Sequence, residues 1–173
     1  HWLGRGLTIT AVATRNPDIA RWAEGRGIPL RAQGELRSPE GLDYDWLLSV
    51  ANLSIIPQPL LDGARRGAVN FHDGPLPRHA GLNAPAWAIL GAEPRHGITW
   101  HLIEGGIDEG DILVSREFEI APDDTTLTLN ARAWEAAVDS FPELAEALLT
   151  GAPARRPQDL SQRSYHPRDK RPP

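Results

Sequence analysis

The sequence predicts an α/β protein with a mostly parallel sheet flanked by helices. Three apolar segments, Leu7–Thr14, Tyr44–Val50 and Ala68–Phe71, contain few polar residues, which is typical of strands buried on both faces. Helical patterns separate these segments along the chain. This alternation predicts βαβ units with right-handed crossovers, in which ligands bind at the carboxyl ends of the strands.

The first half of the chain contains several shorter elements. His1–Gly6 has the pattern of a last helical turn that ends at glycines. Asn16 is expected to cap a helix that begins with Pro17 and ends at Gly25–Gly27. Its buried stripe is formed by Ile19, Ala20, Trp22 and Ala23. A short strand, a polar loop and a short helix are expected at Ile28–Leu30, Arg31–Asp43 and Pro57–Arg66.

The second half begins with a predicted helix at Ala84–Leu90. A strand at Ile98–Ile103 and an alternating segment at Asp111–Ile120 are expected to pair as antiparallel neighbours. Thr125–Leu149 shows the longest helical pattern in the sequence. Pro142 lies inside that pattern, so we expect a break or kink there.

Composition narrows the class of protein. The chain has 173 residues, 40% of them hydrophobic, and a formal net charge of −5, which fits one globular domain and argues against a nucleic-acid surface. No apolar run is long enough to span a membrane. Because the chain has no cysteine, thiolate catalysis and thiolate metal sites are excluded, and a cytoplasmic location is expected. The chain begins at His1 and contains no methionine, so we expect a piece of a larger polypeptide.

The end of the chain differs from the rest in charge and in composition. We expect residues 1–150 to form a catalytic domain and residues 151–173 to form an extended exit segment or linker. This segment is rich in proline and arginine and carries Arg155, Arg156, Arg163, Arg168 and Lys170. Two interpretations remain open, namely a solvated tail and a docking patch for an acidic partner.

The residues best suited to chemistry are Asn70, His72 and Asp108. Asn70 and His72 share a face at a strand end, because side chains in a strand alternate with period two. Asp108 lies in a glycine-rich turn after a later strand, from which it could approach the imidazole. An amide, an imidazole and a carboxylate together suit proton transfer and oxyanion stabilisation. The alternatives are a structural cap at the strand end and a metal site formed with His79, His96 and His101, whose spacing fits no tight ligand motif.

Three motifs resemble the folate-dependent formyltransferase family, in particular the N-terminal catalytic domain of the methionyl-tRNA formyltransferase type. The first is an Asn-x-His pair at Asn70 and His72. The second is a Leu-Pro-x-x-x-Gly loop with Leu76, Pro77 and Gly81, and the third is an Asp-x-Gly turn at Asp108 and Gly110. The resemblance implies a Rossmann-like fold whose first strand is missing before His1. It also implies that Asn70, His72 and Asp108 are catalytic and that 10-formyltetrahydrofolate is the formyl donor.

The resemblance further implies an apolar wall for the folate pterin. The residues at the matching positions are Leu47, Leu48, Val50, Leu53, Ile55, Ile103, Gly105 and Ile107. Packing in the core would account for the residues of the Leu47–Ile55 part of this wall equally well. No metal is implied.

The resemblance also bears on the acceptor amine. The sequence of residues 70–77 and 81–85 is most similar to formyltransferase domains of nonribosomal peptide and polyketide assembly lines, which formylate an aminoacyl group on a carrier protein. Gly74 replaces a serine usual in the family, and His79 and Ala80 replace a usual Tyr-Arg pair. Three alternatives remain, namely a non-catalytic docking domain, a 10-formyltetrahydrofolate hydrolase and a sugar-amine formyltransferase.

Overall fold

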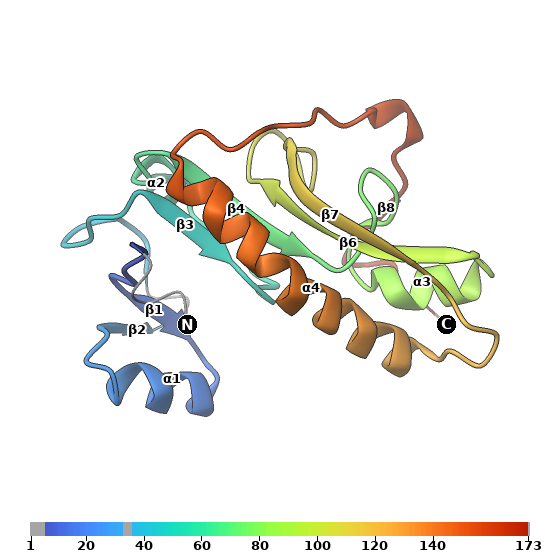
Figure 1. Cartoon of the computed structure of the whole chain (residues 1–173), viewed down its shortest axis with the longest axis horizontal. Helices are drawn as coiled ribbons and strands as arrows, with labels where there is room; N and C mark the ends of the chain where they lie inside the picture. Colours follow the sequence, from blue (N-terminus) through green and yellow to red (C-terminus); the bar gives the residue numbers. More distant parts are fainter. Residues whose placement is uncertain (1–5, 33–35, 173) are drawn as a thin grey trace. The chain divides into compact units, whose positions relative to one another are not determined.

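The computed structural model describes residues 6–32 and 36–172 (Figure 1). The chain divides into two compact units, residues 1–47 with 53–68 and residues 48–52 with 69–173. All but one residue of the helical turn expected at His1–Gly6 lies outside the described residues. Each unit is described below by itself.

The first unit contains a small parallel βαβ motif. Strand β1 (Val12–Thr14) pairs in parallel with β2 (Leu30–Ala32), and helix α1 (Pro17–Glu24) connects them. The Asn16 side chain accepts hydrogen bonds from the backbone N–H groups of Asp18 at 2.8 Å and Ile19 at 3.3 Å. The predicted N-cap is therefore confirmed.

Elements of the first unit are shorter and less buried than the sequence predicts. In α1, Ala23 is buried, whereas Ile19 and Trp22 remain more than a third exposed. Strands β1 and β2 have three residues each, so they provide little apolar surface for α1 to pack against. Helix α2 (Gln58–Asp62) ends well before Arg66, because the Arg65 and Arg66 N–H groups donate to the carbonyls of Tyr44 and Asp45 instead of continuing the helix.

The main sheet has four strands in the order β3 (Trp46–Ser49), β4 (Gly67–His72), β6 (Arg95–Leu102) and β7 (Ile112–Glu119). Strand β6 is antiparallel to both β4 and β7, which confirms the predicted hairpin. The α/β class is confirmed and the main sheet is mixed. Strand β1 pairs with β2 and not with this sheet, so the three predicted parallel strands do not share one sheet.

Helix α4 (Thr126–Leu149) packs along β6 and β7 and closes the core of the second unit (Figure 1). Its buried residues follow the helical spacing of three to four and include Leu129, Ala133, Ala137, Ser140, Leu144 and Leu148. Phe71 and Trp100 are cross-strand neighbours, with ring centroids 5.0 Å apart and ring planes tilted by 50°.

The break predicted at Pro142 is absent, and α4 is one continuous helix. Proline removes the N–H that would bond the carbonyl of Val138. The Val138 side chain is 69% exposed, so that carbonyl lies on the face where water can satisfy it. Buried packing on both sides of Pro142, at Ala137 and Leu144, holds the helix together despite the missing bond.

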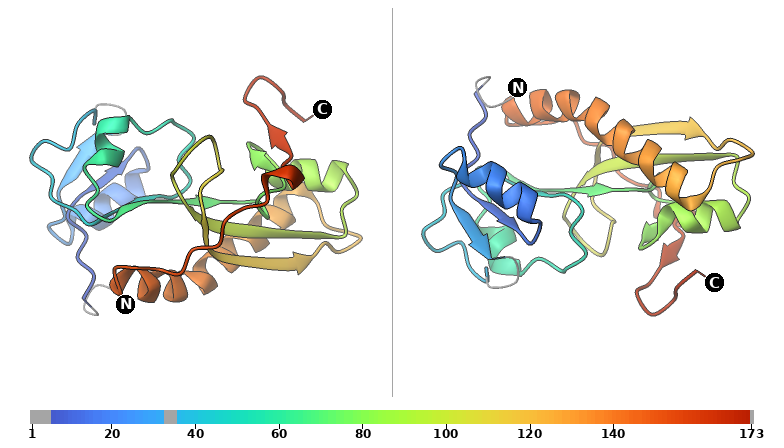
Figure 2. Two further views of the ribbon diagram at one scale, coloured as in Figure 1. Left: turned by 90° about the horizontal axis from the view of Figure 1, so that it is seen from above. Right: turned by 90° about the horizontal axis from the view of Figure 1, so that it is seen from below.

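The segment after α4 returns along the sheet. It contains a short 3-10 helix at Leu160–Gln162 and strand β8 (Tyr165–His166), which pairs in parallel with β5 (Ala80–Gly81). Figure 2 shows this segment running back to β8, beside helix α3 (Ala84–Leu90). Among the described residues, no helix combines the length and the apolar character needed to cross a membrane.

Candidate active site

The pairing of β4 with β6 determines which side chains meet. Asn70 lies directly opposite His101, and His72 lies opposite Thr99. Because side chains alternate along a strand, all four project from the same face of the sheet. A register shift in the pairing of β6 with β7 falls between Trp100 and His101, and such irregularities re-aim the neighbouring side chain.

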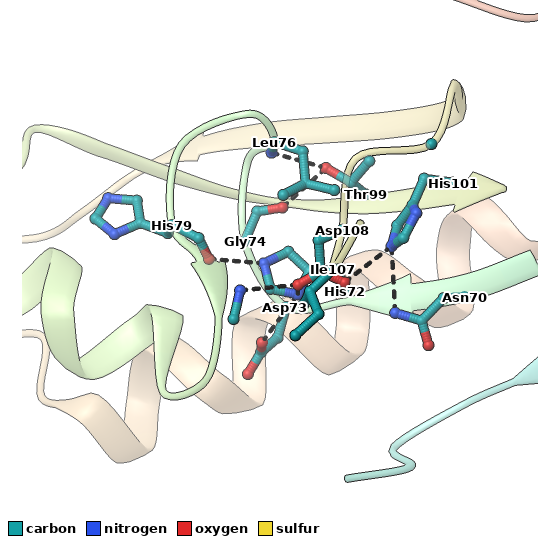
Figure 3. Close-up of polar contacts among 12 residues, drawn as sticks. Asn70, His72, Asp73, Gly74, Leu76, His79, Thr99, His101, Ile107 and Asp108 are labelled. Carbon is teal, nitrogen blue, oxygen red and sulfur yellow. Dashed lines mark hydrogen bonds and ion pairs between the residues drawn. The ribbon is translucent and has the colours of Figure 1, made fainter. Parts of the chain in front are cut away.

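Asp108 joins this group from the turn after β6 (Figure 3). Its Oδ2 lies 3.5 Å from Nδ1 of His72, and its Oδ1 lies 3.3 Å from Nε2 of His101. The Gly81 N–H donates to Oδ2 at 2.8 Å. Asp108 has a φ of 57°, a left-handed conformation that Asp and Asn adopt more readily than most residues. The structure therefore brings together the three residues that the sequence proposes as catalytic, while their roles remain a prediction.

The protonation of His72 follows from its neighbours. Its Nε2 lies 2.8 Å from the carbonyl oxygen of His79, which can only accept, so Nε2 carries a hydrogen and donates it. Its Nδ1 faces two carboxylates, Asp108 and the more distant Asp73 at 4.0 Å. His72 is buried, so water competes little for these contacts. The Nδ1 side is consequently the side from which a proton can be exchanged.

His101 is a site residue that the sequence did not single out as catalytic. Its Nδ1 lies 2.8 Å from the carbonyl oxygen of Leu102 and must donate, while its Nε2 lies 3.2 Å from Nδ2 of Asn70. The ring lies between Asn70 and Asp108 (Figure 3). Its Nε2 accepts from Asn70 in the neutral ring or donates to Asp108 in the protonated ring. Spacing along the sequence carries no signal for this contact, because it depends on the register of β4 against β6.

The surroundings of Asp108 keep its carboxyl ionised. Burial raises the pKa of Asp108, but the His101 hydrogen bond, the His72 charge and the Gly81 N–H together lower the pKa to about 2, from 3.8. Asp108 is thus a carboxylate over the whole physiological pH range. It can stabilise a cationic neighbour or accept a proton in a transition state.

This pKa predicts a dependence of stability on pH. Between about pH 4 and about pH 2 the unfolded chain binds a proton at Asp108 that the native chain does not bind. The lowered pKa therefore contributes about 2 kcal/mol above that window, and this contribution is lost as the pH falls through it. Urea unfolding should show the wild-type advantage over Asp108→Asn shrinking as the pH falls below about 4. A difference that stays constant across this range would contradict the assignment.

The loop between β4 and β5 is shaped around His72. Thr99 donates its hydroxyl hydrogen to the Gly74 carbonyl at 2.8 Å and accepts the Leu76 N–H at 3.1 Å. A Cβ placed on Gly74 would lie 2.8 Å from Nε2 of His72, which is closer than side chains tolerate. The glycine that replaces the usual serine therefore lets the loop close against the imidazole.

The proposed folate wall contains exposed apolar side chains. In the second unit, Leu48, Val50 and Ile107 are 40%, 44% and 46% exposed, and Ile103 is half-buried beside the exposed Gly105. In the first unit, Leu53 and Ile55 are 68% and 81% exposed, and Leu47 is half-buried. Core packing therefore does not account for the exposed residues of either unit, and in the second unit an apolar ligand would cover Leu48, Val50 and Ile107. Ile107 precedes Asp108 in the same turn (Figure 3).

His79 and His96 make hydrogen bonds with other residues of the second unit. His79 contacts Glu93 through Nε2 at 2.8 Å and His166 through Nδ1 at 3.1 Å. His96 is fully buried and its Nε2 lies 2.9 Å from the Asp73 carbonyl. Within residues 6–32 and 36–172, no group of three or more His, Cys, Asp or Glu side chains is arranged to hold a metal ion.

Comparison with known proteins identifies the family of the chain. A sequence model of the family described as formyl transferase matches residues 33–145, which is more than half of the chain. The chain belongs to the formyl transferase family. A methionyl-tRNA formyltransferase from Geobacter sulfurreducens is 32% identical over 170 residues, covering 95% of this chain and 52% of the relative. A second, from an Anaeromyxobacter strain, is 33% identical, covering 92% and 51%. The chain thus spans about half the length of the curated relatives that it matches.

Solved formyltransferases share the fold. A 4-N formyltransferase from Francisella tularensis superposes with a TM-score of 0.76 at 18% identity, covering 92% of this chain and 64% of that one. The formyltransferase PseJ from Anoxybacillus kamchatkensis, solved with a formamido sugar nucleotide and tetrahydrofolate, gives 0.73 at 23% identity, covering 92% and 85%. At these identities the likeness shows the fold alone.

Proposed function

We propose that this formyl transferase family member transfers a formyl group from 10-formyltetrahydrofolate to a primary amine. The observation that carries the proposal is the convergence of Asn70, His72 and Asp108 at the end of β4. Family membership supports the reaction class, and the exposed apolar residues Leu48, Val50 and Ile107 fit a pterin ring.

Each residue of the site has a distinct role in the proposed reaction. The amine attacks the formyl carbon and produces a tetrahedral species with a developing oxyanion. Its collapse breaks the bond between the formyl carbon and N10 of the folate, and N10 takes up a proton and leaves as tetrahydrofolate, while the amine loses its proton. The Asn70 amide stabilises that oxygen as a hydrogen-bond donor, and His72 does so when its Nδ1 carries a proton, because its Nε2 hydrogen is donated to the His79 carbonyl. Asp108 fixes the orientation of His72 and takes part in moving the proton that the amine must lose. His101 holds the Asn70 and Asp108 side chains on either side of its Nε2.

For the acceptor we propose an aminoacyl group on a carrier protein, because residues 70–77 and 81–85 resemble the formyltransferase domains of peptide and polyketide assembly lines. The curated relatives suggest methionyl-tRNA and the solved structures suggest sugar amines as competing acceptors. The basic residues of the C-terminal segment are weaker support for docking of an acidic carrier protein than their number suggests, because three of them are engaged within the chain. Arg155 pairs with Glu104, Arg156 donates to Ser115, and Arg163 donates to the Ile107 carbonyl.

We further propose that residues 1–150 form the catalytic domain, that residues 151–173 lead out of it, and that the protein acts in the cytoplasm. Part of the exit segment contacts the second unit and is therefore not a free linker. Arg156 and Ile112 exchange two backbone hydrogen bonds, and β8 pairs with β5. Residues 156–166 therefore pack on the second unit before the chain leads out of it.

A mass-spectrometric acceptor panel tests the proposal. The purified chain is incubated with 10-formyltetrahydrofolate and, separately, an aminoacyl carrier protein, methionyl-tRNA and an amino sugar nucleotide. We expect one acceptor to gain a formyl group while tetrahydrofolate forms in equal amount. Formate release without any acceptor would identify a hydrolase instead. Binding of 5-formyltetrahydrofolate without turnover on any acceptor would favour a docking domain.

A further inference from the structure

The C-terminal segment Arg156–His166, called the C-terminal strap below, contacts both loops that carry the site. At its far end, Ser164 accepts the His79 N–H through its hydroxyl at 2.8 Å and the Ala80 N–H through its carbonyl at 3.0 Å. The Leu82 N–H donates to the His166 carbonyl at 2.9 Å. The strap therefore anchors the loop of residues 79–82 by three backbone donors.

Stacked rings strengthen this anchor. The His166 ring stacks on Trp87 with centroids 4.7 Å apart and on His79 with centroids 5.3 Å apart. Gly81 permits the close approach, because a Cβ there would lie 2.2 Å from the His166 carbonyl oxygen. A larger residue at position 81 would push the strap away.

The loop that the strap anchors touches both catalytic candidates. The His79 carbonyl accepts the hydrogen on Nε2 of His72, and the Gly81 N–H donates to the Asp108 carboxylate. The positions of these two groups determine the tautomer of His72 and the direction of Asp108. A shift in the loop would alter both.

The middle of the strap anchors the second loop. The Gln158 amide nitrogen donates to the carbonyls of Asp108 at 3.0 Å and Gly110 at 2.6 Å, while Arg163 donates to the Ile107 carbonyl at 2.9 Å. Oε1 of Gln158 is buried and has no hydrogen-bond partner among the described residues. Gln158 therefore acts in this site through its NH₂ group alone.

We propose that the C-terminal strap is a positioning element of the active site, with Gln158 as its principal positioning residue. Gln158 holds the turn that aims Asp108, and Ser164 holds the loop that receives His72. Geometry in an active site must be held closely, since a displacement of about 1 Å can lower a rate by about 10²-fold. Formyl transfer then depends on a segment that touches no reacting atom. The catalytic part of this inference rests on the proposed function.

Gln158→Glu tests the proposal, because it keeps the size of the side chain and replaces the NH₂ donor with a carboxylate. The carboxylate would face two carbonyl oxygens that it cannot bond. We expect kcat to fall by roughly tenfold, with KM for the folate changed less than about twofold. We also expect the activity relative to wild type to recover as the pH is lowered, because a protonated carboxyl regains one donor. A role in packing alone predicts wild-type activity at every pH.

Hydrogen exchange provides a readout that needs no acceptor. In Gln158→Glu the Gly81 amide should exchange roughly tenfold faster than in wild type, because its partner Asp108 is held less firmly. Gln162→Ala is the matched control, since the side chain of this exposed glutamine donates to Asp159 within its own turn. Should Gln158→Glu not fold, Ser164→Ala removes one acceptor from the other half of the strap.

The outcomes separate the two proposals. If wild type transfers no formyl group, the proposed function fails, and the positioning of Asp108 is still judged by the exchange of Gly81. If wild type is active and Gln158→Glu matches Gln162→Ala in kcat, pH dependence and exchange, the strap does not position the site.

Discussion

Replacing His72 with alanine is expected to lower the rate of formyl transfer by about 10²-fold or more, because the proposed mechanism loses a donor that acts on the developing oxyanion. His72 is buried, with its Nε2 2.8 Å from the His79 carbonyl oxygen and its Nδ1 3.5 Å from Oδ2 of Asp108. The affinity for 5-formyltetrahydrofolate should change little, since the lost interaction belongs to the transition state. Single-turnover kinetics measures the first quantity, and isothermal calorimetry measures the second.

Two results would contradict this role of His72. Wild-type turnover by His72→Ala would show that the imidazole takes no part in the reaction. A large loss of folate affinity with unchanged kcat would place His72 in binding rather than in catalysis.

Asp108→Asn should lower kcat by about 10²-fold as well, because the amide keeps the shape of the side chain and loses the charge that faces His72 and His101. Asparagine also accepts the left-handed φ of 57° at this position, so the turn should survive the substitution. The pH profile of kcat should change along with its magnitude, since the carboxylate no longer faces the two histidines.

Asp73→Asn is the matched control for this substitution. Its Oδ1 lies 4.0 Å from Nδ1 of His72, and its side chain is 36% exposed, against 12% for Asp108. Solvent screens a carboxylate so exposed, so the loss of rate should stay within a few-fold. Equal losses from both substitutions would indicate a general effect of negative charge near His72.

The fold could be predicted as far as it depends on periodicity and local chemistry. Ala84–Leu90 is helical with the predicted bounds, and the antiparallel pairing of β6 with β7 is also as predicted. The predicted bounds of β1 and α2 are too wide, because an apolar run does not reveal where hydrogen-bond partners end. The pairing of β5 with β8 was not predicted, since strands of two residues carry no pattern.

The site could be predicted only in part, for a similar reason. Asn70 and His72 share a face because of period two, which the sequence shows directly. His101 lies in the site because of the register of β4 against β6. Gln158 contacts the Asp108 turn because a segment about fifty residues later in the chain folds back onto it. Contacts of this kind depend on tertiary structure and leave no local signal in the sequence.

A double-mutant cycle on His72 and Asp108 tests the central claim most directly. The single-turnover rate of formyl transfer is measured for wild type, His72→Ala, Asp108→Asn and the double variant, with the acceptor that the panel identifies. If the two side chains work as one unit, the double variant should lose little more than either single variant. Losses that multiply to about 10⁴-fold would show that the two residues act independently and would contradict the account.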